Sequence, residues 1–392
     1  MSTSAHDAMS LPNLPMNPNR SYEDASGLRS EEMILNMGPQ HPSTHGVLRL
    51  VLTLDGETVI QCTPVIGYLH RGMEKIFENR PYMAGIRYID NADYLSPMLN
   101  EIVYAMAIEQ LLGIEPPRRA QYIRLIVGEL ERIASHLVAI GTYGLDLGAT
   151  TPILWAFRDR EQILDMFEAL SGHRFTHNYL RPGGVMHDFP KGWLQTCEAW
   201  CEQFLERGVP ELDALLTGNE IFEARTEGVG YIDREQAIAY ALTGPLARAS
   251  GVAFDVRVDR PYGAYREIAV RPQVRHEGDC FARYLVKMAE MVESVRLIRA
   301  AIDRLPGGSI AQRAPIALRP PRGETYAAVE SARGEESVYM ISDGSEYPYR
   351  AKLRGPSFVN LAILPELLRG HKIGDVIAIL GSIDIVLGDV DR

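Results

Sequence analysis

The sequence predicts an α+β fold in which a central α-helical bundle is flanked by a small N-terminal antiparallel β meander and a C-terminal β hairpin region. Apolar residues alternate with a period of two near the N-terminus, recur at spacings of three and four in the middle, and alternate again after residue 325. With 392 residues, 46% of them hydrophobic, the chain can fill a sizeable core. No internal repeat or clear linker divides it. We therefore expect a single domain over residues 31–392, made of segments 31–67, 68–310 and 311–392.

The amino-acid composition argues against some classes of function and indicates the compartment. The 51 acidic side chains outnumber the 40 basic ones, and the net charge of -11 argues against a general nucleic-acid-binding surface. The four cysteines follow no disulfide framework and include no CxxC pair, which suggests a reducing compartment. Residues 1–30 lack the apolar centre of a signal peptide, and we expect them to form a flexible N-terminal arm.

The predicted meander begins with a short strand at Met33 to Asn36. A second strand runs from Val47 to Leu54 and has leucine at every other position. Asp55-Gly56 is a strong two-residue turn signal ahead of a third strand at Thr58 to Ile66. The alternation of the second strand is typical of a half-buried sheet.

The loop from Gly38 to Gly46 joins the first two strands and contains two histidines, His41 and His45. Two prolines and the terminal glycines stiffen it as a hairpin tip that presents both imidazoles. Rigid loops that present titratable groups are common functional sites. A metal site is the weaker interpretation, because it needs at least a third protein donor and none is close in sequence. A hydrogen-bonding or structural role is favoured for the pair.

Two polar segments lie between the meander and the bundle. Residues 68–75 are expected to form a short helix, on which Arg71 and Glu74 are three positions apart and can pair. The run from Tyr88 to Pro97 is polar and aromatic and precedes a helix expected at about 98–112. Tyr94 in this run has two interpretations, a core aromatic with a satisfied hydroxyl or a ligand-binding residue.

The bundle is predicted from long amphipathic stretches. Pro116-Pro117 begin the clearest helix, with apolar residues from Ile123 to Ile140 at spacings of three and four. The window from Leu137 to Phe157 holds a single charge, Asp146, but its glycines, threonines and proline predict a buried helix end, a turn and a new helix instead of a membrane span. Further helices are expected at about 152–170, 192–216, 234–242 and 278–305.

Strand periodicity returns in the C-terminal segment. Residues 326–331 and 337–341 flank a turn at 332–335 as a hairpin, 349–353 adds a strand, and short helices follow at about 358–369 and 373–380. The chain ends in an apolar run from Gly381 to Arg392 with an internal aspartate, Asp384. A tail this apolar is seldom free in solvent, so we expect it to dock back into the fold.

Common cofactor motifs are missing from the sequence. There is no GxxxxGK[ST] phosphate loop and no GxGxxG after a strand, so binding of ATP or NAD by this chain is not supported. No HExxH metal motif appears either. We therefore expect this chain to bind no cofactor of its own.

Three blocks of sequence resemble the quinone-site subunit family, D type, of respiratory complex I, the proton-pumping NADH:quinone oxidoreductase. They are the loop from Gly38 continuing to Leu50, the block from Tyr68 to Lys75, and the segment from Gly381 to Arg392. The match runs from about Met33 to Arg392 with its motifs in order. The resemblance also implies a fold similar to that of the large subunit of nickel–iron hydrogenases.

The resemblance implies roles for individual residues. In that family the residues matching His45 and Tyr94 hydrogen-bond the two sides of a quinone head group, and an aspartate at the position of Asp146 pairs with the histidine. Tyr94 thereby changes from a core residue to a ligand. The arginine matching Arg71 lies near the terminal iron–sulfur cluster. Support for the pocket is expected from four side chains, Arg71 itself, His41, Ser96 and Asp384.

Residues of these types suit quinone reduction, which needs two electrons and two protons. A histidine that titrates near neutrality and a neutral tyrosine hydroxyl are suitable proton donors. An aspartate beside His45 would raise the pKa of the histidine. Loss of a proton to the quinol would then change this charge pair, which we hypothesise triggers conformational coupling.

The resemblance implies partners as well. Quinone is the substrate, and electrons come from an iron–sulfur cluster in a neighbouring small subunit. Further contacts are expected with the C-type subunit and with the membrane subunits at the quinone entry, so the chain would be peripheral, on the cytoplasmic face of the bacterial cell membrane. Hydrogenases hold their metal through two CxxC pairs that this sequence lacks, so we expect no metal. The alternatives are a hydrogenase-like metalloenzyme, the same subunit in a ferredoxin-driven complex, and a scaffold subunit with inert loop histidines.

Overall fold

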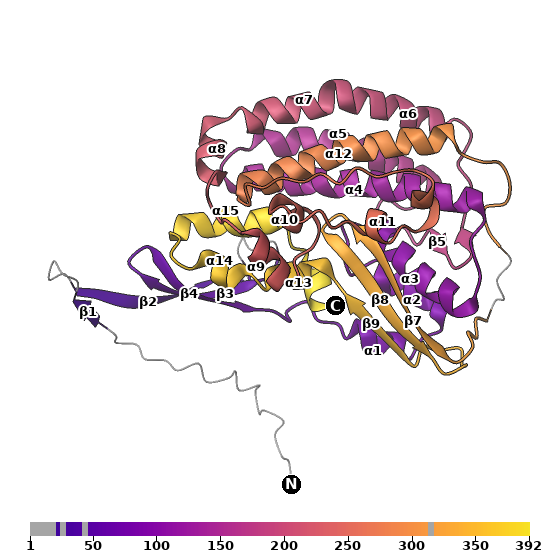
Figure 1. The fold of residues 1–392 in the computed structure, drawn as a ribbon, viewed down its shortest axis with the longest axis horizontal. Helices are drawn as coiled ribbons and strands as arrows, with labels where there is room; N and C mark the ends of the chain where they lie inside the picture. Colours follow the sequence, from indigo (N-terminus) through magenta and orange to yellow (C-terminus); the bar gives the residue numbers. More distant parts are fainter. Residues whose placement is uncertain (1–20, 24–28, 41–45, 313–316) are drawn as a thin grey trace, which may run out of the picture.

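The computed structural model describes residues 21–23, 29–40, 46–312 and 317–392. It confirms the predicted α+β fold. Long helices stack over one side of the molecule, a meander projects from one end, and a second sheet lies against the opposite end of the bundle (Figure 1).

The meander is confirmed and is longer than expected. Its strands pair antiparallel in the order β1 (Ser21–Glu23), β2 (Arg29–Met37), β3 (Arg49–Asp55) and β4 (Thr58–Val65). The leucines of β3 and Leu48 before it are buried, as their alternation predicts. β1 and the first residues of β2 fall within the segment expected to be a flexible arm. Backbone pairing, such as that of Ser21 with Glu31, adds this edge strand, and so short a strand has no apolar pattern in the sequence that could predict it.

The segment after the meander differs from the prediction. The helix α1 (Met73–Phe77) begins only after Gly72. The left-handed conformation of Gly72, with φ 62°, prevents the helix from starting earlier. The pair that the spacing of Arg71 and Glu74 allows is not formed. Arg71 instead donates to the backbone oxygen of Asn91, and the Glu74 carboxylate pairs with Arg350 and Lys352 from a distant strand.

The bundle is organised around one central helix. α4 (Arg118–Asp146) packs against α5 (Thr151–Ser171) and α12 (Cys280–Asp303), while α3 (Pro97–Leu112) lies beside the C-terminal sheet (Figure 1). The predicted helix end near Asp146, turn and new helix are confirmed. In the described part of the chain, no helix is long and apolar enough to cross a membrane.

The remaining helical segments are shorter. The helix expected at 192–216 is a continuous run in which α6 (Trp193–Gln203) and α7 (Val209–Leu212) alternate with the π-helical turns η2 (Phe204–Gly208) and η3 (Asp213–Thr217). The helix α9 (Arg234–Ala239) was expected. Several short elements were not, because elements of this length depend on tertiary packing: α2 (Tyr82–Ile89), β5 (Leu180–Arg181), β6 (Gly184–Val185), α8 (Glu220–Thr226), α10 (Gly244–Ala249), α11 (Val256–Asp259) and η4 (Gly263–Arg266).

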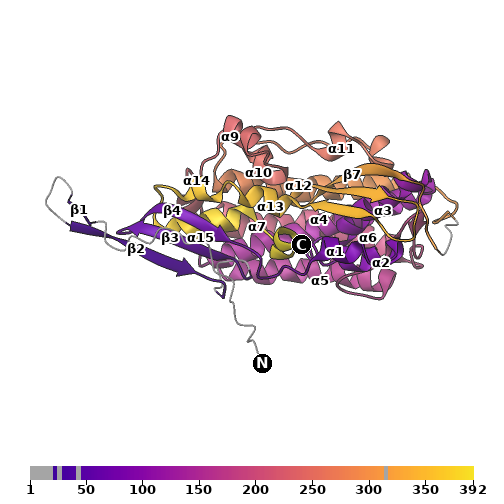
Figure 2. The same ribbon diagram turned by 90° about the horizontal axis from the view of Figure 1, so that it is seen from below.

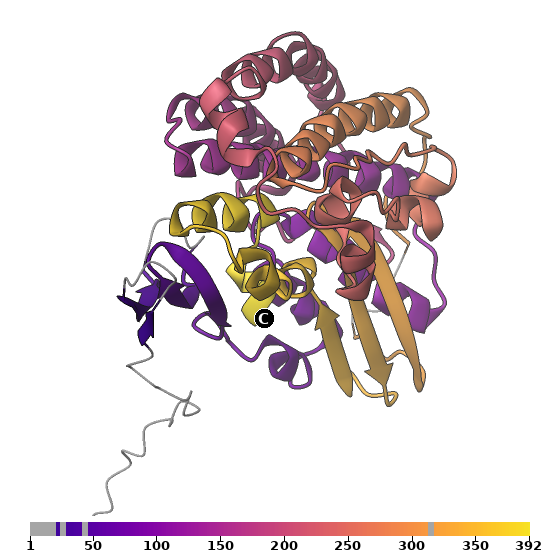
Figure 3. The same cartoon turned by 60° about the vertical axis from the view of Figure 1, so that its left-hand side comes forward.

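The C-terminal sheet is confirmed as β7 (Gly323–Ser331), β8 (Gly334–Ser342) and β9 (Arg350–Arg354). The helix expected at 358–369 is broken into two, and two more helices complete the chain: α13 (Pro356–Leu361), α14 (Leu364–Leu368), α15 (Ile373–Ile383) and α16 (Leu387–Asp391). These helices lie between the meander and the sheet (Figures 2 and 3). The loop between α14 and α15 is joined to β4 by backbone hydrogen bonds, such as the one from the Val59 N–H to the His371 carbonyl at 2.9 Å.

Candidate functional site

The candidate site is built around the C-terminal tail, residues 381–392. The tail docks into the fold as predicted, and residues 381–391 are buried throughout. It contacts three segments that are distant in sequence and that carry the predicted site residues. These segments are the end of α4, the turn between α2 and α3, and Gly46 at the end of the histidine loop ahead of β3.

Tyr94 lies in the turn of residues 90–96 between α2 and α3, which we call the Tyr94 turn. Its ring packs against the tail at Gly388, where a Cβ atom would lie only 3.1 Å from Tyr94 Cδ1. On another side, the ring of Phe175 lies 6.3 Å away at an angle of 50°. Burial raises the pKa of Tyr94, and the positive charge of Arg333 opposes this shift. The Tyr94 phenol is therefore neutral at pH 7 and able to donate a hydrogen bond.

Asp146 is the last residue of α4 and is half-buried. A Cβ atom on Gly381 would lie 3.6 Å from Asp146 Oδ2 and 2.8 Å from a ring carbon of Tyr143. Glycine at position 381 thus allows the tail to approach the end of α4 closely. Asp146 therefore lies beside the first residues of the tail, and its pairing with His45 stays a prediction.

The two loop histidines, His41 and His45, lie outside the described residues. The two ends of their loop are nevertheless placed. Met37 pairs with Leu50 at the base of the hairpin, and a Cβ atom on Gly46 would lie 3.8 Å from Cδ1 of Leu387. The residue that follows His45 in the sequence therefore lies against the tail.

Arg71 contacts the Tyr94 turn, and Ser96 is the last residue of this turn. The exposed Arg71 guanidinium donates to the carbonyl of Asn91 at 3.2 Å. Ser96 is fully buried at the start of α3, and its hydroxyl has no hydrogen-bond partner among the described residues. The segment beside Arg71 is fixed to the tail, because the carboxylate of Asp391 accepts from the backbone N–H groups of Gly67 and Leu69, each at 2.7 Å.

Asp384 is held in a left-handed conformation, with φ 59° and ψ 58°, which non-glycine residues seldom adopt. Arg333 stabilises it by donating to its backbone oxygen at 2.9 Å and to its carboxylate at 3.2 Å. The ammonium of Lys287 lies 3.6 Å from the other carboxylate oxygen. All three side chains are at least nine-tenths buried.

Arg333 also joins the tail to the Tyr94 turn. Its Nη1 donates to the Asp93 carboxylate and to the Ser135 hydroxyl of α4, both at 2.9 Å. Burial opposes a charged guanidinium, but Asp384 and Asp93 hold the pKa of Arg333 above its ordinary value. The positively charged Arg333 is therefore bound to Asp93, the residue that precedes Tyr94 in the sequence.

Sequence reasoning missed Arg333, because the turn at 332–335 had every feature of an ordinary hairpin tip. Charged turn residues are normally solvated. Here the β7–β8 turn points into the protein. Gly334 lies so close to Gly244 that a Cβ atom added to Gly334 would be 2.6 Å from the backbone nitrogen of Gly244. No local signal in the sequence reveals this burial.

A second buried network lies between α4 and α12. His136 Nε2 is 2.9 Å from the carboxylate of Glu290, which Arg248 contacts at 2.7 Å. Burial alone would raise the pKa of Glu290, but Arg248 and His136 lower it to about 2. The same arginine contacts Glu330 of β7 at 2.7 Å, so this network fastens the sheet to the bundle.

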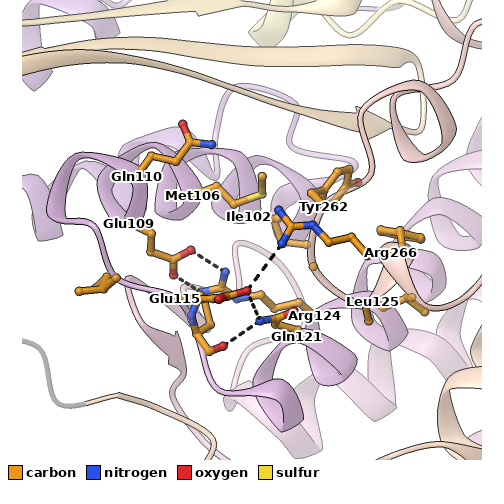
Figure 4. A pocket seen from close by; sticks show the side chains of 15 residues that line it. Ile102, Met106, Glu109, Gln110, Glu115, Gln121, Arg124, Leu125, Tyr262 and Arg266 are labelled. Atoms are coloured by element: carbon orange, nitrogen blue, oxygen red, sulfur yellow. Dashed lines mark hydrogen bonds and ion pairs between the residues drawn. The ribbon is translucent and has the colours of Figure 1, made fainter.

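A well-formed cavity of about 290 Å³ lies elsewhere in the fold, at the opposite end of the α3–α4 hairpin (Figure 4). Its floor holds the buried Arg124–Glu109 pair, and an exposed Glu115–Arg266 pair spans its rim. No predicted site residue lines it. Among the described residues, no group of three or more His, Cys, Asp or Glu side chains is placed to hold a metal ion.

Comparison with known proteins decides the family. A family model described as "Respiratory-chain NADH dehydrogenase, 49 Kd subunit" matches residues 146–320 and 313–392. The chain belongs to this family. The D-type subunit of the NADH-quinone oxidoreductase of Desulforamulus reducens is 52% identical over 364 residues, which cover 93% of this chain and 99% of the relative.

Other relatives of this chain are similar over nearly their whole length. The D-type subunit of the NADH-quinone oxidoreductase of Geobacillus thermodenitrificans is 52% identical over 93% of this chain and 100% of the relative. An H-type subunit of the NAD(P)H-quinone oxidoreductase of Gloeobacter violaceus is 47% identical over 93% of this chain and 98% of the relative. The chain is thus a subunit of complex I, a component of an oxidoreductase assembly that works together with other subunits.

Proposed function

We propose that this subunit forms the quinone-binding pocket of complex I. The observation that carries the proposal is the packing of one buried tail against Tyr94, against the end of α4 at Asp146, and against the residue after His45. Three residues that are far apart in the sequence would thereby face a common wall. The names of the relatives, which are quinone oxidoreductase subunits, support quinone as the substrate.

In the proposed mechanism, the reduced quinone oxygens take up one proton each. The neutral Tyr94 hydroxyl donates to one oxygen and His45 donates to the other, where negative charge develops on reduction. Asp146 pairs with His45, stabilises its protonated form and is left facing a neutral imidazole after the transfer. Arg333 and Asp93 hold the Tyr94 turn in place, so that the tyrosine oxygen is positioned before the quinone arrives.

The electrons for quinone reduction would come from partner subunits. No prosthetic group is bound by this chain, and two electrons reach the quinone from an iron–sulfur cluster in the adjacent small subunit. Exposed Arg71, beside the Tyr94 turn, would face that subunit. The C-type subunit and the membrane subunits at the quinone entry complete the surroundings, with the chain peripheral at the cytoplasmic face of the membrane.

The test is Tyr94→Phe in the assembled complex, with NADH as the electron donor. The variant keeps the ring that packs on Gly388 and removes only the hydroxyl. Loss of a positioned proton donor is expected to lower kcat for quinone reduction by about 10²–10⁴-fold. Tyr231→Phe, which changes an exposed tyrosine, is the matched control and should leave the rate unchanged.

The outcomes separate the competing functions. If Tyr94→Phe and His45→Ala both assemble and retain full quinone reductase activity, the chain is a scaffold and the proposal is wrong. Nickel and iron analysis of the purified chain tests the hydrogenase-like alternative. A stoichiometric metal would contradict the present proposal.

A further inference from the structure

Two buried carboxyl groups lie at the start of the Tyr94 turn and just beyond its end. Asp90 is the first residue of the turn and follows the last residue of α2, and Glu101 lies in the first turns of α3, the helix that follows the turn. Their exposed fractions are 1% and 0%. Neither residue has a role in the mechanism above.

Each carboxyl group uses one oxygen to hold the segment of residues 178–180. Glu101 Oε2 accepts from the backbone N–H groups of Tyr179 at 2.8 Å and Leu180 at 2.5 Å. Asp90 Oδ2 accepts from the backbone N–H of Asn178 at 3.1 Å. The pair thus connects the Tyr94 turn to the neighbouring loop through three backbone hydrogen bonds.

The other oxygen of each carboxyl group is buried and has no donor among the described residues. These oxygens are Asp90 Oδ1 and Glu101 Oε1, and the two side chains are within hydrogen-bonding reach of one another. Two ionised carboxylates cannot form a hydrogen bond, because both are acceptors only. The contact requires a proton on one of them.

We propose that Asp90 and Glu101 share one proton, and that this protonated pair positions the Tyr94 turn against residues 178–180 for quinone reduction. The positioning role rests on the function proposed above, whereas the sharing of the proton does not. Ionisation of both groups would place two like charges in contact in a dry interior, and the turn would be pushed away from the loop.

The surrounding charges are consistent with one retained proton. Burial raises the pKa of Asp90 to about 6, with Glu131 adding to the rise and His177 opposing it. Burial and the neighbouring Asp90 raise the pKa of Glu101 well above its usual range, and Arg181 opposes this only in part. His177 cannot neutralise the pair fully, because its Nε2 lies 3.4 Å from Glu131 and its Nδ1 contacts the carbonyl of His173.

The proton itself is tested by infrared difference spectroscopy of the assembled complex. At neutral pH, subtracting the Glu101→Gln spectrum from the wild-type spectrum should leave the carbonyl band of a protonated carboxylic acid. Glu227→Gln, at a residue just beyond the C-terminus of α8, is the control and should leave none. If both differences are free of the band, the sharing of a proton is refuted.

The positioning role is tested by pH profiles of quinone reduction. Asp90→Asn keeps a hydrogen bond to Glu101 and cannot ionise, so its activity near neutral pH should stay within about threefold of wild type while the alkaline limb of the profile shifts by about one unit or more. Asp90→Ala should lower kcat by about tenfold or more, because a catalytic group that is misplaced loses rate. A profile for Asp90→Asn that coincides with wild type would overturn the positioning role.

These outcomes are distinguishable from failure of the proposed function. If Tyr94→Phe is fully active while the Glu101 band is present, the quinone proposal fails and the shared proton stands. If Tyr94→Phe is inactive while the band is missing, the quinone proposal stands and the shared proton fails.

Discussion

Replacement of Gly381 by alanine tests whether close approach of the tail controls the site. Gly381 lies within α15, where the added methyl group would meet Tyr143 Cδ2 at 2.8 Å and Asp146 Oδ2 at 3.6 Å. Tyr143 cannot move away freely, because its buried ring packs edge-on against Phe222 with centroids 5.5 Å apart. The tail or the end of α4 must therefore shift.

Two opposing effects set the magnitude. Alanine is favoured over glycine inside a helix by about 0.5–1 kcal/mol. Overpacking of a tight contact costs about 1–3 kcal/mol, so the clash exceeds the gain in propensity and Gly381→Ala is destabilising. The matched control is Gly374→Ala in the same helix, where the nearest atoms to the new methyl group are Arg225 side-chain nitrogens at 3.7 Å. This control has no clash and should be neutral or slightly stabilising.

Urea unfolding of the full chain measures the difference. We expect the Gly381→Ala free energy of unfolding to be lower than that of Gly374→Ala by about 1–3 kcal/mol. In the assembled complex, displacement of Asp146 should reduce kcat/KM for quinone by about tenfold or more. Equal stability and equal activity of the two variants would refute the reasoning that the tail is tightly fitted at this point.

Three further predictions follow from buried groups. Arg333→Met leaves the buried carboxylates of Asp93 and Asp384 without their cation, so urea unfolding should show a loss of about 3–5 kcal/mol, against about 0.5 kcal/mol or less for the exposed Arg369→Met. Against the effect of burial, neighbouring arginines lower the pKa values of Glu290 and Glu129 to about 2, so the stability that these carboxylates contribute is present above their ordinary pKa and is lost as the pH falls from about 5 toward 2. The urea midpoint of unfolding should therefore drop in that pH window. The drop should be less steep in Glu290→Gln, which has one such carboxylate fewer. Burial raises the pKa of Cys62 to about 12, so iodoacetamide at pH 8 should alkylate this thiol in the unfolded chain and not in the folded one, as peptide mass spectrometry can establish.

The fold was predictable where periodicity is long. The leucine alternation of β3 and the apolar spacing of α4 each repeat over several turns or pleats, and both elements were found with nearly the expected bounds. The glycine, threonine and proline residues after Asp146 correctly ended one helix and began the next. Short elements such as α10 and α11 carry no comparable pattern, because their conformation is fixed by neighbours that are remote in sequence.

The candidate site was only partly predictable. Tyr94, Asp146 and Asp384 were named from the sequence, and the structure brings each of them to the C-terminal tail or places it within the tail. Arg333 and the Asp90–Glu101 pair were not found, because burial of a charged side chain depends on which segments meet in space. A turn that reads as solvent-exposed can carry a buried arginine when two glycines, such as Gly244 and Gly334, let two backbones touch.

The most direct test is a structure of the assembled complex with quinone bound. We predict that one head-group oxygen lies within hydrogen-bonding distance of the Tyr94 hydroxyl and the other near His45, with the C-terminal tail as the wall behind them. A head group bound away from Tyr94, for example in the cavity between Glu109 and Arg266, would contradict the assignment of this site.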